Sequence, residues 1–268
     1  MVKRAFSLSH CPGCGFYFVD NPDTNYESIY DLDYYQGRGA DPMIDYIWES
    51  ENPQTTVRNY EWQGIAAVAQ HFVKNLKGAK WLDYGCGTGG LLSYGARTYG
   101  AAMFGFEHGW AAERATQAGL SILSERALKE DGLSFDIITA IEVLEHCFDP
   151  ISELRLIRQL LKPGGLFFYT TGNSQPFQGD ILNWSYFQPE IHISLFQPKT
   201  MDYCLKTCGF KVEDGYFLPG LDQIIRYKIL KNLGLKSMNI FEKCLPWPVL
   251  SRLVDGQYKI SAYPIGRG

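Results

Sequence analysis

The amino-acid sequence predicts an α/β fold with a mainly parallel sheet. Helical and strand patterns alternate from about residue 56 onward, which is typical of such folds. A glycine-rich turn follows the first strand of this alternation, at the point where parallel sheets bind their ligands. The 268 residues, of which 46% are hydrophobic, suffice for one sizeable core, so we expect one main domain.

The elements of the alternating region each have their own signal. Apolar residues recur at helical spacing from Ile65 to Leu76, and a Lys-Gly pair ends that helix. Asp149 and Pro150 have the pattern of an N-cap and a first helical position, which predicts the start of another helix. The predicted strands cover residues 79–84, 102–107, 120–123, 135–141 and 166–171.

The C-terminal part continues this pattern and then departs from it. A helix is expected from Pro198 to Cys208, followed by a strand over residues 211–217. Residues 221–253 are helical in pattern, and strand character returns over residues 257–265. We therefore expect a helical insertion before a final strand.

The first 55 residues have weak periodicity and are rich in Asp, Asn, Pro, Gly and Tyr. This composition predicts a loop-rich arm and not a separate domain. The expected organisation is an N-terminal arm over residues 1–55 and one α/β domain over residues 56–268.

The charge balance narrows the class of partner. The chain has 25 basic and 29 acidic residues and a net charge of −4, so no basic excess neutralises phosphates and no nucleic-acid partner is expected. No apolar run reaches the roughly 18 residues of a membrane span, and the N-terminus lacks a signal-peptide pattern. We expect no membrane association and a cytoplasmic location, and the oligomeric state stays open.

The turn over residues 85–90 has glycines at the spacing G-x-G-x-x-G, which is typical of nucleotide-binding α/β proteins. Asp83 ends the preceding strand, two residues before Gly85. A carboxylate there repels a pyrophosphate and attracts an ammonium group. The charge therefore favours an amino-acid-like cofactor over a dinucleotide.

Glu107 ends the second predicted strand and lies 20 positions after Gly87. At this separation an acidic side chain meets the diol of a ribose, so the pair indicates a nucleoside. Dinucleotides also contain that ribose. An NAD(P)-dependent oxidoreductase therefore stays an alternative at this point.

Four segments together resemble one enzyme family. Residues 83–89, Asp-Tyr-Gly-Cys-Gly-Thr-Gly, resemble motif I of the class I S-adenosylmethionine-dependent methyltransferases. Residues 135–146, 161–166 and 192–198 resemble the fourth-strand motif, the entry to strand five and the segment before the last helix. Their order and spacing are similar to the branch of ubiquinone-pathway O-methyltransferases and of sugar and natural-product methyltransferases.

The resemblance implies a Rossmann-like, doubly wound sheet of seven mostly parallel strands with the last strand antiparallel. It also implies S-adenosylmethionine as cofactor and S-adenosylhomocysteine as product. Ser124 and Glu125 stand where the family usually has a Gly-Asp pair, which departs from its pattern. The residues expected to contact the cofactor are Asp83, Gly85, Cys86, Gly87, Gly89, Glu107, His108, Ser124, Glu125, Ala140 and Ile141.

His146 and His192 are the candidate catalytic residues. Both follow predicted strands at the edge of the sheet where ligands bind, and a histidine is a natural base for an oxygen or nitrogen acceptor. A role in turn capping or packing stays open for each. The aromatic residues 184–187, together with Tyr34 and Tyr35, are candidates for a lid over the site.

Cys11 and Cys14 form a C-x-x-C pair followed by glycine, which resembles half of a zinc site. One pair supplies two of the four ligands that a structural zinc needs. The sequence therefore favours a turn with two thiols over a bound zinc.

These observations predict a methyltransferase that acts on a small molecule, with O-methylation of a sugar, polyketide or quinone-like acceptor. Two alternatives stay open. One is the NAD(P)-dependent oxidoreductase, and the other is a non-catalytic S-adenosylmethionine-binding module that docks a protein partner.

Overall fold

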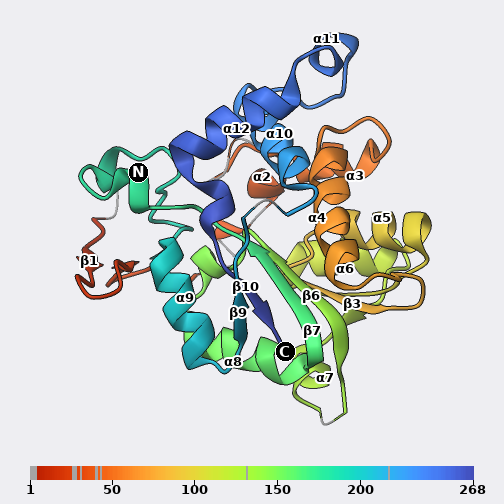
Figure 1. Ribbon diagram of the computed structural model, residues 1–268, viewed down its shortest axis with the longest axis horizontal. Coiled ribbons are helices and arrows are strands. Elements are labelled where there is room, and N and C mark those ends of the chain that lie inside the picture. The colour runs from red at the N-terminus through yellow and green to blue at the C-terminus, as the bar shows by residue number, and fades with distance from the viewer. Residues whose placement is uncertain are drawn as a thin grey trace.

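The computed structural model describes residues 5–25, 29–30, 32–39, 42, 44–130, 132–216 and 218–268. A seven-stranded sheet at its centre has the strand order β5-β4-β3-β6-β7-β10-β9 (Figure 1). The strands are β3 Lys80–Tyr84, β4 Ala102–Phe106, β5 Ile122–Leu123, β6 Phe135–Ile141, β7 Leu161–Thr170, β9 Lys211–Glu213 and β10 Ile265–Arg267.

The pairing directions agree with the expected fold. β3 pairs in parallel with β4 and β6, β4 pairs in parallel with β5, and β6 with β7. β10 runs antiparallel to both of its neighbours, β7 and β9. The predicted Rossmann-like sheet with its last strand antiparallel is therefore confirmed.

Helices pack against both faces of this sheet. These helices are α4 Arg58–Phe72, α5 Gly90–Tyr99, α6 Gly109–Gln117, α7 Glu125–Lys129, α8 Pro150–Leu160, α9 Pro198–Thr207 and α10 Leu221–Asn232. Two further helices, α11 Ile240–Lys243 and α12 Trp247–Tyr258, follow α10 outside these layers, and α12 packs against α10. Successive residues of a strand point to opposite faces. Leu82 and Ile138 accordingly pack with α8 and α9, whereas Trp81 and Ile137 pack with α4, α5 and α10.

Two helix ends test the expected boundaries. The N-cap at Asp149 is confirmed, because its carboxylate accepts the backbone N–H of Ser152 at 3.0 Å and Pro150 is the first residue of α8. The helix predicted to reach Leu76 ends earlier, at Phe72. Val73 has φ −113° and ψ 83°, which is outside the helical region, so the chain turns there towards β3.

The expected final strand over residues 257–265 is wrong in its extent. α12 continues to Tyr258, and β10 covers only the last residues of the chain. The Asp255 carboxylate accepts the backbone N–H of Ser261 at 2.7 Å, which closes a turn between the helix and the strand. The strand expected over residues 211–217 is β9 and ends at Glu213. Phe217 lies outside the described residues.

The N-terminal arm contains more regular structure than its composition suggests. β1 Leu8–His10 and β2 Tyr17–Val19 form an antiparallel hairpin. β2 also pairs with β8 Ser194–Leu195, which gives a separate three-stranded sheet. This pairing joins the first residues of the chain to the segment after strand β7. Two short helices follow the hairpin, α2 Leu32–Tyr35 and α3 Tyr46–Glu51.

No helix in the described part of the chain is both long enough and apolar enough to cross a membrane.

Candidate cofactor and active site

A cavity of about 1310 Å³ lies at the carboxyl ends of the central strands. Asp83, Glu107 and Ile141 reach it from or just beyond β3, β4 and β6. In open α/β sheets this edge, where neighbouring crossovers diverge, is the usual place for a ligand. A second depression lies on the exposed surface of α7 and is lined by four charged side chains only. The deep cavity is therefore the candidate site.

Asp83 is 4% exposed and has one polar neighbour that fixes it. Thr139 Oγ1 donates to Asp83 Oδ1 at 2.7 Å, and Trp81 Nε1 donates to Thr139 Oγ1 at 3.0 Å. Burial raises the pKa of Asp83 to about 7, against the smaller opposing effect of the Thr139 hydrogen bond. A cationic ligand group beside Asp83 would stabilise its ionised form.

The turn after β3 requires glycine at two positions for different reasons. Gly85 has φ +78°, and a Cβ atom there would overlap the Val143 side chain. Gly87 has φ +53° with open space around it, and its backbone N–H donates to Glu107 Oε2 at 2.8 Å. A side chain at either position strains the turn, and at Gly85 it also meets a neighbouring residue.

Glu107 lines the same cavity next to the glycine turn, and we call this part of the cavity the cofactor end. Its carboxylate accepts the backbone N–H groups of Gly87 and His108, each at 2.8 Å. Burial raises the pKa of Glu107, and these two hydrogen bonds oppose the rise. The carboxylate is held beside the glycine turn, which is where an acidic side chain accepts hydrogen bonds from a ribose diol.

Most of the residues expected at the cofactor do line this cavity. They are Asp83, Gly85, Cys86, Gly87, Gly89, Glu107, His108 and Ile141, and the candidate catalytic residues His146 and His192 line it as well.

Ser124, Glu125 and Ala140 are not among the residues that line the cavity. Ser124 is the N-cap of α7, and its hydroxyl accepts the backbone N–H of Ala127 at 3.2 Å. Glu125 forms an exposed ion pair with Lys129 on the same helix. Ala140 is fully buried in the core of the sheet. The cofactor contacts expected of these three residues therefore stay predictions.

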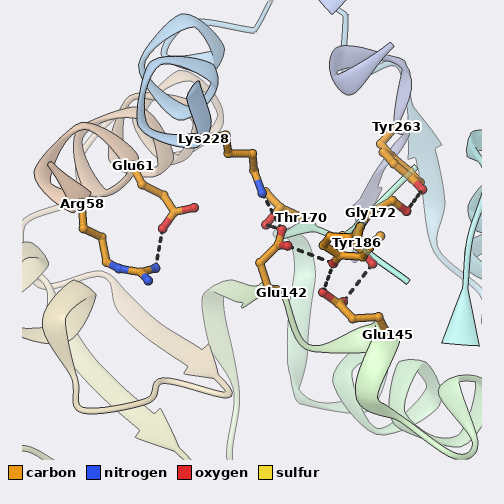
Figure 2. Close-up of polar contacts among 10 residues, drawn as sticks. Arg58, Glu61, Glu142, Glu145, Thr170, Gly172, Tyr186, Lys228 and Tyr263 are labelled. Carbon is orange, nitrogen blue, oxygen red and sulfur yellow. Dashed lines mark hydrogen bonds and ion pairs between the residues drawn. The ribbon is translucent and has the colours of Figure 1, made fainter. Parts of the chain in front are cut away.

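The other end of the cavity is built around Glu142, directly after β6 (Figure 2). Its carboxylate binds Lys228 Nζ of α10 at 2.7 Å, Thr170 Oγ1 at 2.7 Å and the Tyr186 hydroxyl at 3.0 Å. Burial acts to raise the pKa of Glu142, but the charges of Lys228 and Lys231 outweigh it and hold the pKa below its usual range. Glu142 also has φ +54°, a conformation that costs energy for a residue other than glycine.

Tyr186 links Glu142 to a second buried carboxyl group, that of Glu145 (Figure 2). Thr171 Oγ1 donates to Glu145 Oε2 at 2.8 Å. Burial raises the pKa of Glu145, and the negative charge of Glu142 adds to this rise. One tyrosine hydroxyl carries a single proton. Both contacts are therefore hydrogen bonds when Tyr186 donates to Glu142 and a protonated Glu145 donates to Tyr186.

The two histidines lie next to this network, with their ring centroids 5.0 Å apart. His192 Nδ1 contacts the backbone carbonyl of Tyr186, and because a carbonyl only accepts, Nδ1 carries the proton. In neutral His192 the lone pair is then on Nε2. His146 Nδ1 lies 3.0 Å from the Tyr30 hydroxyl. Burial, together with the nearby His192, lowers the pKa of His146 to about 4.

Two residue groups have the composition of a metal site. Glu145, His146 and His192 present ligand atoms within 4.8 Å of one another. Both Glu145 oxygens already have protein partners, so this group fits proton transfer better than metal binding. Cys11 and Cys14 are partly exposed free thiols. Within the described residues no third ligand completes a group with them. His10, directly before Cys11 in the sequence, stacks on Tyr17 with ring centroids 4.1 Å apart.

The aromatic residues expected to form a lid divide between two environments. Tyr34, Tyr35 and Tyr186 line the cavity, as expected of a lid. Trp184 is instead buried against Phe177, with stacked rings 4.9 Å apart, so it belongs to the packing of its own loop.

Sequence patterns did not indicate several charged residues of the cavity. Arg58 and Glu61 in the first turn of α4 form an ion pair at 2.8 Å, and Lys231 of α10 lines the cavity with them (Figure 2 shows the pair). Lys228 affects the charge of the cavity through its ion pair with Glu142. The one available signal for Arg58 and Glu61 was their position as a charged pair in the first turn of α4, and no sequence signal pointed to Lys228 or Lys231.

This strand order, with an acidic strand end, a glycine turn and a second-strand glutamate, defines a Rossmann-like nucleoside-binding α/β protein. The particular family follows from sequence. Residues 58–214 match the family described as "Methyltransferase domain". The chain therefore belongs to this methyltransferase-domain family.

Individual relatives match a shorter part of the chain. A ubiquinone biosynthesis O-methyltransferase of Pseudomonas fluorescens (strain SBW25) is 38% identical over 112 residues, which is 38% of this chain and 48% of that protein. One from Ruegeria pomeroyi is 42% identical over 111 residues, which is 37% of this chain and 43% of that protein. The chain thus matches about half the length of these curated relatives.

Among solved structures, the plantazolicin methyltransferase BpumL in complex with SAH has a similar fold. It superimposes with a TM-score of 0.51 at 16% sequence identity, over 77% of this chain and 86% of that chain. At this identity the similarity concerns the fold alone.

Proposed function

We propose that the protein transfers a methyl group from S-adenosylmethionine to an oxygen atom of a small-molecule acceptor. The observation that carries this proposal is the buried carboxyl group of Asp83 at the glycine turn, facing the same cavity as Glu107. A methionine ammonium suits a buried carboxylate, whereas a pyrophosphate does not. Membership in the methyltransferase-domain family supports the same choice over an oxidoreductase.

The described residues fit this cofactor at both of its ends. Asp83 would hold the ammonium group, the glycine turn would let the backbone approach the amino-acid part, and Glu107 would accept from the ribose hydroxyls. His108 is exposed beside Glu107, on the side expected for the adenine. When bound, S-adenosylmethionine supplies an electrophilic methyl group on sulfur.

The protein would then have two tasks, which are alignment of the acceptor oxygen and removal of its proton. A direct displacement depends mainly on alignment and on exclusion of water. His192 Nε2 is the base that we favour, because the Nδ1 contact to the Tyr186 carbonyl leaves the lone pair on Nε2. His146 would orient the acceptor together with the hydroxyl of Tyr30.

The side chains that line the same part of the cavity support a choice of acceptor class. Tyr30, Tyr46 and Tyr186 line the cavity, and rings of this kind pack against flat, partly apolar molecules. The relatives named as ubiquinone biosynthesis O-methyltransferases favour a phenolic, quinone-like acceptor. A polyketide or sugar hydroxyl is the next choice.

Calorimetry with S-adenosylmethionine, S-adenosylhomocysteine and NAD tests the cofactor. We expect binding of the first two and none of NAD, and tight NAD binding without the others would support an oxidoreductase instead. Transfer of labelled methyl groups over a panel of phenols, polyketides and sugars tests catalysis. Cofactor binding with no transfer to any acceptor class would favour a non-catalytic module.

A further inference from the structure

The C-terminal helical segment, residues 233–259, has an unusual surface. It carries exposed apolar side chains where it leaves the body of the protein: Leu233 is 69% exposed, Ile240 73%, Phe241 83%, Val249 57% and Leu253 66%. Isolated apolar residues on a surface are ordinary. Here five lie within one short stretch of chain, and Leu245 is exposed as well. Such a cluster indicates a surface that binds a partner.

The arrangement of these residues favours a flat partner. Val249 and Leu253 lie four residues apart on α12, so they share one face of that helix. Phe241 lies on α11, which projects from the rest of the molecule at the end of the segment farthest from the central sheet (Figure 1). The exposed apolar groups therefore occupy a protruding tip and a helix face, and no groove is needed to receive them.

The charges of the same segment have one sign. Lys243, Arg252 and Lys259 are exposed, and none of the acidic side chains within this segment is. Lys236 is also exposed but forms an ion pair with Asp45 at 2.9 Å, so the other three supply the basic charge. Glu242 is 3% exposed and binds Arg226, and Asp255 is partly buried and binds Ser261. The chain as a whole has a net charge of −4, so this basic surface is a local feature.

We propose that residues 233–259 dock the protein onto an anionic lipid surface. Apolar groups that enter the headgroup region, flanked by basic groups that contact lipid phosphates or carboxylates, are the elements of a helix lying in the membrane interface. A second copy of this chain would meet the same positive charges, which disfavours a dimer through this surface. This proposal departs from the expectation of no membrane association, which rests on the lack of a spanning segment and of a signal-peptide pattern.

The segment is also close to the candidate active site. α12 packs against α10, and α10 provides Lys231 to the cavity and Lys228 to Glu142. Docking would thus bring a lipid surface within one helix of the cavity. An apolar acceptor dissolved in the lipid would then be close to the cavity. Docking itself does not depend on the proposed methyl transfer.

Sedimentation of the full chain with vesicles tests the proposal. One set contains phosphatidylcholine alone and the other a mixture with phosphatidylglycerol. We expect binding to the mixed vesicles that is at least tenfold stronger, and that weakens with added salt. Equal binding to both sets, or binding to neither, would overturn the proposal.

Variants distinguish the two components of the surface. F241S/L253S should weaken binding to the mixed vesicles at least tenfold, and K243E/R252E should weaken it more, since each basic group near an anionic surface contributes roughly fivefold. The matched controls are L182S, at a residue that is 72% exposed elsewhere, and K206E on α9. Unchanged binding in the first two variants would contradict the proposal.

The same samples also test whether the variants fold and whether the surface binds a second copy of the chain in place of lipid. Thermal unfolding should give equal midpoints for all variants, because the substituted side chains are exposed. Sedimentation equilibrium without vesicles should give a monomer–oligomer balance that F241S/L253S does not change. Oligomers that this variant abolishes, without lipid binding, would assign the surface to a second copy of the chain.

Discussion

The two ends of the cavity are built in different ways. The cofactor end comes from two neighbouring strands and their turns, and Asp83, Gly85, Gly87 and Glu107 lie within 25 residues of sequence. The acceptor end combines Tyr30, Glu142, Tyr186 and Lys228, which come from an N-terminal loop, β6, a later loop and α10. A local motif fixes the first end, whereas tertiary packing assembles the second. The acceptor end can therefore change while the cofactor end stays the same.

The largest expected effect is on the rate of methyl transfer, and it should arise at the acceptor end of the cavity without a change at the cofactor end. His192→Asn should lower kcat by about 10²–10⁴-fold, because it removes the proposed base, and should leave the Kd of S-adenosylmethionine within about twofold. Labelled methyl transfer to the acceptor that the panel identifies measures the rate. His71→Asn, on the exposed side of α4, is the matched control. Equal rates in the two variants would remove His192 from catalysis.

Asp83→Asn should instead change the cofactor end of the cavity and weaken the binding of S-adenosylmethionine. This substitution keeps the shape of the side chain but removes the charge opposite the ligand ammonium, so the Kd of S-adenosylmethionine should rise about 100-fold. Calorimetry measures the affinity, and Asp202→Asn on the solvent-facing side of α9 is the control. An affinity equal to that of the unmodified protein would show that Asp83 does not contact the ammonium.

Lys228→Met tests how α10 supports the acceptor end. Loss of the lysine leaves the Glu142 charge without its closest partner, so the free energy of unfolding should fall by about 2 kcal/mol. This value is below that of a fully buried pair, since the side chains are 22% and 24% exposed. Urea unfolding measures it. Lys206→Met, in an exposed pair, should change stability by less than about 0.5 kcal/mol.

The pH dependence of this variant follows from the sign of the Glu142 shift. The pKa of Glu142 is lowered in the folded protein, so the stabilisation is complete above the ordinary value of 4.5 and is lost as the pH falls below it. The difference between the unmodified protein and Lys228→Met should shrink on acidification. A difference that grows instead would contradict the assigned ion pair.

The smallest effect concerns the titration of Asp83. With a pKa raised to about 7 by burial, Asp83 is protonated below that pH in the ligand-free protein, and a cation prefers its ionised form. The affinity for S-adenosylmethionine should therefore fall up to tenfold per pH unit below about 7. Calorimetry across this range should give a flat profile for Asp83→Asn. A flat profile in both proteins would contradict the titration.

The same contrast explains what could be predicted from sequence. The individual strands and the glycine turn depend on local patterns, so they and the Asp83 to Glu107 pair were accessible, and the family resemblance implied the antiparallel last strand. Ser124 stays a predicted contact, and the structure shows its side chain as the N-cap of α7, a role that a polar residue at a strand end also fits. Lys228 gave no signal, because its role depends on how α10 packs against the sheet. Likewise, no periodic pattern in the sequence indicates that Tyr186 bridges two carboxyl groups.

The N-terminal hairpin has a consequence for how the chain tolerates truncation. Val19 donates its backbone N–H to the carbonyl of Ile193 at 2.9 Å, and β2 pairs with the strand that follows. Ile193 is the neighbour of His192, so strand β2 of the hairpin supports the loop that bears this imidazole. Cleavage after residue 25 would remove this support from one side of the loop, while the bonds from Ile193 to Glu145 and from Ser194 to Cys147 would hold the other side.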